Sequence, residues 1–409
     1  MEDAFRTLDD GSTTWRSSAA PRFARRCLAK LRGVLRSQNY SEASATGLIG
    51  MGPAAQGAWP RLGNAGLIEA ARRGVASTTA ALLGTFLLNA TVPAAQLEAA
   101  LGTPLTADLE ALGVLWRPTM ADAWHSTVQI APVEVSGLDA GQMFFFVDWD
   151  ELRPWHQVMT VTIDSYALLR AQELLPSIPR RLLDLCAGSG VQGLSAAVRF
   201  GASAALVDLN PRAVRFAKAN ILLNQVSKVT LYHGNLFQAL PKRCREHVAR
   251  SSADLDCGWG PYDLILANPP YVPSMGGGQM FVSGGDRGET VTSDIVRGAG
   301  QALAPNGRLL IVANLANVDG NYVGKLRSWW NAYQVPPKMG VSFEVLHGDV
   351  WTPADYAAGF FGPEAARANY RRFLQSAGVS SMTNGFIFAV AQPAMAQDPR
   401  CLGRARGVP

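Results

Sequence analysis

From residue 181 onward, short apolar runs alternate with stretches in which apolar residues recur at helical spacing. Each run is nearly continuous in apolar character, which is typical of a strand buried on both faces of a parallel sheet. Strands that alternate with helices build a doubly wound α/β fold. The pattern predicts strands at residues 181–185, 204–208, 228–232, 263–267 and 308–314.

Two further strand-like runs, at residues 342–348 and 385–392, predict an antiparallel pair at the end of this sheet. Between them lies an insertion, residues 353–378, that is rich in aromatic side chains. We expect residues 393–409 to form a disordered tail.

The first half of the chain has mainly helical spacing. Residues 1–20 are polar and are expected to be disordered. Between Pro21 and Gln38, arginines and a lysine interleave with apolar residues, which predicts an amphipathic basic helix. This helix is either an ordinary surface helix or a contact for nucleic acid or another acidic partner, and the pattern leaves both open.

Further helical patterns follow, and then two strand-like stretches at residues 126–135 and 143–148. We therefore expect residues 21–150 to form a helical accessory or substrate domain with a short β ribbon. A helix over residues 166–175 leads into the α/β segment. The other helical patterns lie at residues 67–71, 79–88 and 94–101.

Composition narrows the class of protein. The chain has 409 residues, of which 48% are hydrophobic and 17% charged, as in a globular protein with a large core. No apolar run reaches the roughly 18 residues of a membrane span, and we expect a cytoplasmic protein without a signal peptide. Five scattered cysteines form no CxxC pair, which disfavours a zinc site and a disulfide framework. The net charge of +5 permits a nucleic-acid partner without requiring one.

The first candidate site is a glycine-rich turn after the strand at 181–185. Gly188 and Gly190 allow a tight turn and a close approach of the backbone to a ligand. Alone, this GxGxxG pattern is a weak dinucleotide signal. Asp184 precedes the turn on the strand, where a carboxylate suits a cationic amino group.

The next two strands also end in polar residues. Asp208 ends the strand at 204–208, where an acid can accept both hydroxyl groups of a ribose. The third strand leads to Asn235 and Leu236, a polar and an apolar group that suit the two sides of an adenine ring.

The most specific motif is Asn268-Pro269-Pro270-Tyr271, directly after the strand at 263–267. Two prolines cannot continue a strand, so the chain leaves the sheet with a stiff, extended backbone. Ligands bind at this carboxyl edge of open α/β sheets. A side-chain carbonyl, backbone carbonyls and an aromatic ring together suit a flat NH₂ group.

The order of these motifs resembles that of class I S-adenosylmethionine-dependent methyltransferases, in the branch that methylates nitrogen on planar groups. The resemblance covers about residues 160–392 and is greatest to release-factor glutamine and ribosomal RNA guanine-N2 methyltransferases. It implies a seven-stranded Rossmann-like core and S-adenosylmethionine as the cofactor, with no metal. Two residues depart from the family pattern: Cys186 stands where a first glycine is common, and Asn235 where aspartate is usual.

The resemblance also implies a role for each site residue. Asp184, Gly188 and Gly190 would hold the methionine part of the cofactor, Asp208 the ribose, and Asn235 with Leu236 the adenine. The other expected cofactor contacts are Cys186, Leu209 and Asn268. Asn268, Pro269 and Tyr271 would be catalytic, and Pro270, Tyr271 and Val272 would contact the substrate.

The expected function is therefore methylation of a planar amide or amine nitrogen on a protein or small molecule. One alternative acceptor is the exocyclic amine of a nucleobase in RNA or DNA. From another class, the chain could be a non-catalytic cofactor-binding module or a nicotinamide-dependent enzyme.

Overall fold

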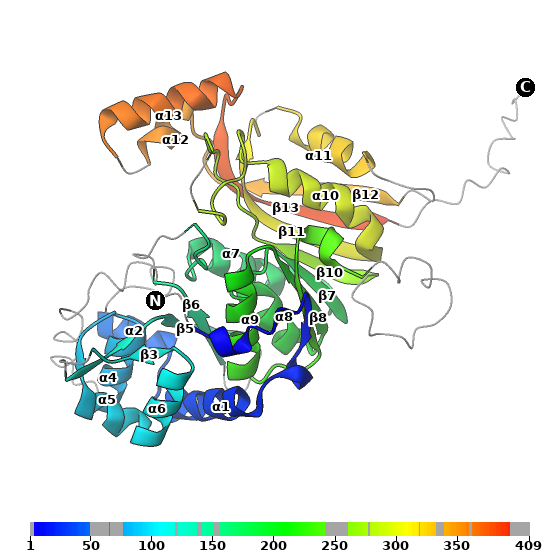
Figure 1. Cartoon of the computed structure of the whole chain (residues 1–409). Helices are drawn as coiled ribbons and strands as arrows, with labels where there is room; N and C mark the ends of the chain where they lie inside the picture. The colour runs from blue at the N-terminus through cyan, green and yellow to red at the C-terminus, as the bar shows by residue number, and fades with distance from the viewer. Residues whose placement is uncertain are drawn as a thin grey trace, which may run out of the picture.

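The structure of the chain is a computed structural model that describes most of the sequence (Figure 1). The described residues are 4–49, 65, 77–118, 122–136, 141–149, 155–241, 261–276, 279–318, 320–332, 339–359 and 362–392. The predicted helix at 67–71 and the predicted tail at 393–409 lie outside them. No helix among the described residues is both long and apolar enough to cross a membrane.

An eight-stranded sheet in the order β1-β9-β8-β7-β10-β11-β13-β12 organises the molecule. Neighbouring strands from β9 to β11 are parallel, whereas β13 runs antiparallel to both β11 and β12. The strands are β7 (Arg181–Leu185), β8 (Ser203–Asp208), β9 (Val229–His233), β10 (Tyr262–Ala267), β11 (Leu303–Ala316), β12 (Gly340–His347) and β13 (Met382–Gln392). The α/β core and each strand predicted from residue 181 onward are confirmed.

Helices cover both faces of this sheet (Figure 1). One apolar core joins the sheet to α7 (Ile163–Ala171), α8 (Val191–Phe200) and α9 (Pro211–Leu223). The other joins it to α10 (Thr290–Ala302) and α11 (Tyr322–Asn331). The central strands β7, β8 and β10 are therefore buried on both faces, which explains their continuous apolar runs in the sequence. The aromatic insertion contains α12 (Pro353–Ala358) and α13 (Glu364–Ser376).

The prediction that residues 1–20 are disordered is wrong for residues 4–20. This segment forms the short helices η1 (Arg6–Leu8) and η2 (Ser17–Ala19), and β1 (Thr14–Arg16) between them. β1 pairs antiparallel with β9 and adds an eighth strand to the expected seven. Phe5 and Trp15 are buried, so a few large apolar side chains anchor a segment that is polar on average.

The first half of the chain is helical, as its pattern predicts, and carries small ribbons. The helices are α1 (Arg22–Ser37), α2 (Glu42–Ile49), α4 (Ser77–Phe86), α5 (Ala94–Leu101) and α6 (Thr103–Ala111). The strands are β2 (Val92–Pro93), β3 (Leu115–Trp116), β4 (Ala123–Ser126), β5 (Gln129–Glu134) and β6 (Gln142–Val147). The strand expected at 126–135 is thus interrupted after Ser126, and the apolar core runs without a break from α1 to the sheet.

Asn220 of α9 and Asn224, the residue directly after this helix, satisfy the open edge of the β5–β6 ribbon. The Phe146 N–H donates to Asn220 Oδ1 at 2.7 Å, and Asn220 Nδ2 donates back to the Phe146 carbonyl at 3.1 Å. Asn224, one helical turn later, makes the same pair of bonds with Phe144 at 2.9 and 2.7 Å. Because unpaired backbone groups are costly when buried, these side chains take the place of a neighbouring strand.

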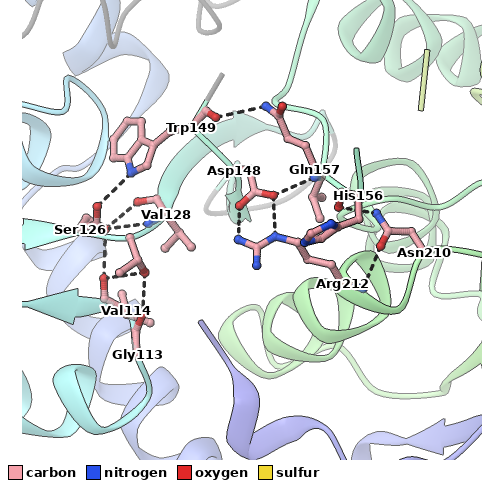
Figure 2. A network of polar contacts seen from close by, with 12 residues as sticks. Gly113, Val114, Ser126, Val128, Asp148, Trp149, His156, Gln157, Asn210 and Arg212 are labelled. Carbon is pink, nitrogen blue, oxygen red and sulfur yellow. Dashed lines mark hydrogen bonds and ion pairs between the residues drawn. The ribbon is translucent and has the colours of Figure 1, made fainter. Parts of the chain in front are cut away.

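A buried ion pair joins the same two elements (Figure 2). Asp148 follows β6 and is fully buried, and Arg212 on α9 is 3% exposed. Arg212 binds both carboxylate oxygens, with Nε 2.8 Å from Oδ2, and the Val158 N–H donates to the same Oδ2 at 2.8 Å. The carboxylate therefore ties together β6, α9 and the segment that leads to α7.

Removal of the Asp148 carboxylate should strongly destabilise the fold, because it leaves the Arg212 charge buried and unpaired. We expect Asp148→Ala to lower the free energy of unfolding by about 3–5 kcal/mol, as measured by urea denaturation. Arg297→Ala breaks an exposed ion pair with Asp294 and should cost less than about 1 kcal/mol. Equal losses in the two variants would contradict this account of the ion pair.

Candidate active site

The polar residues predicted from the sequence meet at the carboxyl edge of the sheet. β7 lies between β8 and β10, and in the parallel register Leu185 pairs with both Val207 and Ala267. Cys186, Asp208 and Asn268 are the residues that follow these three positions. The turn after β7, the end of β8 and the motif after β10 therefore lie side by side.

The turn after β7 depends on backbone conformations that favour glycine. Cys186, Gly188 and Gly190 have φ angles of 57°, 56° and 83°, all in the left-handed region. A Cβ atom at Gly190 would lie 3.1 Å from the side chains of Leu194 and Leu206. Cys186 adopts this conformation although it has a Cβ atom, at a cost of about 1–2 kcal/mol in backbone energy. A further glycine, Gly193, lets α8 pack directly on the Asp184 side chain.

Asp184 is a buried carboxylate at the base of this turn. Its Oδ2 accepts a hydrogen bond from the Gly193 N–H at 2.8 Å, and the side chain is 1% exposed. No cation pairs with it among the described residues. Burial raises the pKa of Asp184 to about 7, and the negative charge of Asp208 contributes to the rise. A cationic group of a ligand could therefore pair with the Asp184 carboxylate.

Asp208 links the turn to the end of β8. Its Oδ2 accepts from the Gly188 N–H at 2.7 Å and its Oδ1 accepts from the Asn210 N–H at 2.8 Å. Burial raises the pKa of this carboxyl group, whereas the hydrogen bonds lower it. Each carboxylate oxygen retains acceptor capacity, so the side chain can bind ligand hydroxyl groups as well.

The other predicted cofactor residues form the rim of the edge. Leu209 is 52% exposed. Its carbonyl lies 3.2 Å from His233 Nε2, which joins the ends of β8 and β9. Asn235 is exposed and precedes the short helix η5 (Leu236–Ala239), where Leu236 is half-buried with a φ of 43°. These residues offer an apolar and a polar contact surface on one side of the glycine turn.

The Asn268-Pro269-Pro270-Tyr271 motif leaves the sheet directly after β10. Pro269 is buried, whereas Asn268, Pro270 and Tyr271 are half-buried. No hydrogen bond joins the Asn268 amide to another described residue, so this side chain is available to a ligand.

A glycine-rich segment supports the motif from the far side. A Cβ atom at Gly284 would lie 2.8 Å from the Pro270 carbonyl oxygen, and one at Gly288 would lie 2.2 Å from that of Tyr271. Val272 pairs with this segment, since its N–H donates to the Val282 carbonyl and its carbonyl accepts from the Gly284 N–H, each at 2.9 Å. The motif is therefore held by its own prolines and by close backbone packing.

Two side chains that sequence reasoning missed also contact this region. The Tyr271 hydroxyl donates a hydrogen bond to Asp164 of α7. The Tyr370 hydroxyl of α13 donates to the Pro273 carbonyl at 2.8 Å, so the aromatic insertion lies against the loop after the motif. Asp164 carries no local signal in the sequence, because it lies 107 residues from its partner.

Part of the chain is similar to known methyltransferases. Residues 160–335 match the family model described as Methyltransferase small domain. The ribosomal protein uL3 glutamine methyltransferase of Bradyrhizobium diazoefficiens is 32% identical over 147 residues, which cover 33% of this chain and 41% of that protein. The corresponding protein of Burkholderia pseudomallei is 30% identical over 168 residues, covering 38% and 52%. The chain thus spans about half the length of these curated relatives, or less.

Among solved structures, a methyltransferase from Pyrococcus furiosus is similar, with a TM-score of 0.31 and 16% identity. The similarity covers 56% of this chain and 83% of that structure.

The segment matched by the family model contains the five parallel strands β7 to β11, the glycine turn and the Asn268–Tyr271 motif. Residues 160–335 of this chain are therefore similar to the methyltransferase small domain, and they lie in the parallel part of the α/β sheet.

Proposed function

We propose that the protein transfers a methyl group from S-adenosylmethionine to the side-chain amide nitrogen of a protein substrate. The observation that carries this proposal is the β7–β10 register, which puts Asn268 beside the glycine turn. The relatives from Bradyrhizobium diazoefficiens and Burkholderia pseudomallei are named as glutamine methyltransferases of a ribosomal protein, which supports an amide acceptor. Residues 160–392 would form the methyltransferase domain and residues 21–150 an accessory domain that contributes to substrate binding.

The residues at the edge fit S-adenosylmethionine. Asp184 is a buried carboxylate that pairs with no cation in the described part of the chain, and the cationic amino group of the cofactor would supply one. A Cβ atom at Gly188 would meet no other atom within 4 Å, which leaves room for a ligand against the backbone. Gly190, Asp208, Leu209, Asn235 and Leu236 complete the proposed cofactor site. When bound, S-adenosylmethionine supplies a methyl group that is activated by a cationic sulfur.

The Asn268–Tyr271 motif would orient the amide nitrogen that accepts the methyl group. An amide nitrogen is a poor nucleophile because its lone pair is delocalised into the carbonyl group. Asn268 Oδ1 and the Pro269 carbonyl would accept the two N–H hydrogens, and the Tyr271 ring would stack on the amide plane. The two acceptors favour the positive charge that develops on nitrogen. No strong base is needed, since the methylated cationic nitrogen is acidic and loses its proton afterwards.

Substitution of Asn268 should separate cofactor binding from methyl transfer. Because Asn268→Ala removes an acceptor that acts on the developing charge, we expect transfer to fall by about 10²- to 10³-fold. Cofactor affinity, measured by calorimetry, should fall by much less than the transfer rate, because Asn268 is only one of several expected cofactor contacts. Transfer is measured with tritiated S-adenosylmethionine into the proteins of a cell extract. Asn331→Ala, at an exposed position at the end of α11, is the control. A wild-type transfer rate in Asn268→Ala would refute the mechanism.

The Asp184 carboxylate should make the stability of the cofactor-free protein depend on pH. Its pKa rises from an ordinary value of 3.8 to about 7 in the folded protein. The folded state therefore binds the proton more tightly than the unfolded chain, so stability falls as pH rises from about 4 to about 7. Asp184→Asn retains an oxygen for the Gly193 N–H and carries no charge.

We expect Asp184→Asn and wild type to be equally stable near pH 4. At pH 8 the variant should be more stable by up to about 4 kcal/mol in urea denaturation. Added S-adenosylmethionine should stabilise wild type more than the variant. A stability difference that stays constant from pH 4 to pH 8 would contradict the assignment.

A second candidate function, methylation of a nucleobase amine, rests on a basic groove between α1 and the end of α9. The groove has a volume of about 540 Å³, and Arg22, Arg25 and Arg26 line it. α1 carries no acidic residue, and the rest of the groove lining is neutral. It consists of the polar Ser17, Gln225 and Ser227 and the apolar Ala29, Ile221, Leu222 and Val226. Guanidinium groups bind phosphates well in such a setting.

If this groove binds RNA, replacement of all three arginines by glutamine should weaken the affinity for single-stranded RNA. It should also reduce the slope of log affinity against log salt by about 2, since each lost phosphate contact contributes about 0.7. Fluorescence anisotropy between 50 and 200 mM salt, roughly the range over which such contacts act, measures both quantities. A triple variant of three exposed arginines elsewhere, Arg180, Arg327 and Arg371, is the matched control. Equal weakening in both triple variants would argue against this candidate function.

A further inference from the structure

The Tyr271 ring is held at its far end by a carboxylate from another part of the fold. Its hydroxyl donates a hydrogen bond to Oδ2 of Asp164, the second residue of α7. Both side chains are half-buried, and the Asp164 carboxylate makes no other hydrogen bond or ion pair with the described residues. This contact connects the proposed acceptor motif to a helix that precedes the sheet in sequence.

The first turn of α7 is a firm support for this carboxylate. Ser165, the residue after Asp164, is buried, and its carbonyl accepts a hydrogen bond from Gln192 Nε2 at 2.9 Å. Gln192 is the second residue of α8, the helix that begins at the glycine turn. Its own Oε1 accepts from Gln172 Nε2 at 2.8 Å. The position of Asp164 is therefore fixed relative to the proposed cofactor site.

The prolines of the motif leave the orientation of the Tyr271 ring undetermined. Pro269 and Pro270 stiffen the backbone and so fix the direction in which the Tyr271 Cβ points. Rotation about the side-chain bonds remains, and the torsion that turns an aromatic ring has a broad energy profile. A hydrogen bond at the hydroxyl removes this freedom, because it anchors the ring at the end opposite to Cβ.

The electrostatics keep the hydroxyl as the donor of this bond. Burial and the neighbouring Asp164 raise the pKa of Tyr271 well above its ordinary value, so the hydroxyl stays protonated. Burial also raises the pKa of Asp164, whereas the bond from Tyr271 lowers it. A bond from a neutral hydroxyl to a carboxylate is shorter and roughly twice as strong as one between neutral groups. The ring is thus held by a strong contact.

We propose that Asp164 is a positioning residue for methyl transfer, which acts by holding the Tyr271 ring parallel to the planar group of the substrate. This inference rests on the proposed function and adds to it a group outside the Asn268–Tyr271 motif. Asp164 contacts Tyr271 and acts on the substrate only through that side chain.

A double-mutant cycle tests the role. The variants are Asp164→Ala, Tyr271→Phe and the double variant, with Asp164→Asn as the conservative variant that retains an acceptor oxygen. Asp294→Asn, which removes an exposed acid on α10, is the matched control. The probe is tritiated S-adenosylmethionine with a fixed amount of cell-extract protein. The rate of label transfer is followed, and cofactor affinity is measured by calorimetry to show that each variant is folded.

We expect Asp164→Ala and Tyr271→Phe each to slow transfer by about 10- to 100-fold, the effect of a lost charge-assisted hydrogen bond. The double variant should be no slower than the slower single variant, because both substitutions remove one bond. Asp164→Asn should restore most of the rate, and cofactor affinity should be the same in all variants.

If the wild-type protein transfers label, either of two results would overturn the role of Asp164. One is a wild-type rate in Asp164→Ala, and the other is a double variant whose loss equals the product of the two single losses. A wild-type protein that transfers no label would overturn the proposed function itself, and this role with it.

Discussion

The parallel pairing of β7 with β8 on one side and β10 on the other is the constraint on which the rest of the structure depends. Leu185 stands level with Val207 and with Ala267, so the chain leaves three neighbouring strands at the same height. A shift of this register by one residue would move Asn268 away from the glycine turn and turn buried strand residues to the opposite face. The apolar cores on the two faces of the sheet therefore fix the site as well as the fold.

The first half of the chain is attached to this site through α9, which begins just after Asp208. Asn220 and Asn224 pair with the edge of β6, and Arg212 pairs with the buried Asp148. The segment between Trp155 and Val158 continues the connection to the loop after the motif. Gln279 Nε2 donates to Gln157 Oε1 at 2.5 Å, and the Met280 N–H donates to the Trp155 carbonyl at 2.8 Å. The first half of the chain is therefore joined to the loop after the motif by direct hydrogen bonds.

Local pattern and residue chemistry were sufficient to predict the core sheet. Strands buried on both faces have continuous apolar runs, and the Pro269-Pro270 pair marks the end of β10 wherever the chain goes next. The glycine positions predicted the turn, although the left-handed conformation of Cys186 needed the structure. Whether the residues at this edge bind cofactor and substrate as expected stays a prediction.

The features that could not be predicted depend on contacts between distant segments. β1 is a strand because β9 offers it an edge, and its sequence is too short and too polar to show a strand pattern. Asn220 and Asn224 resemble ordinary polar residues of a helix until β6 is placed beside them. Asp164 lies at a helix start, where acids are common for local reasons, so its bond to Tyr271 has no separate signal. Tertiary packing decides each of these cases.

We propose above all that the protein methylates an amide nitrogen at the carboxyl edge of its sheet. The most direct measurement is mass spectrometry of cell-extract proteins after incubation with the purified protein and S-adenosylmethionine that carries a deuterated methyl group. The account predicts a labelled methyl group on the side-chain nitrogen of a glutamine or asparagine in a discrete protein. Label in RNA alone, or on an oxygen or sulfur atom of a protein, would contradict it.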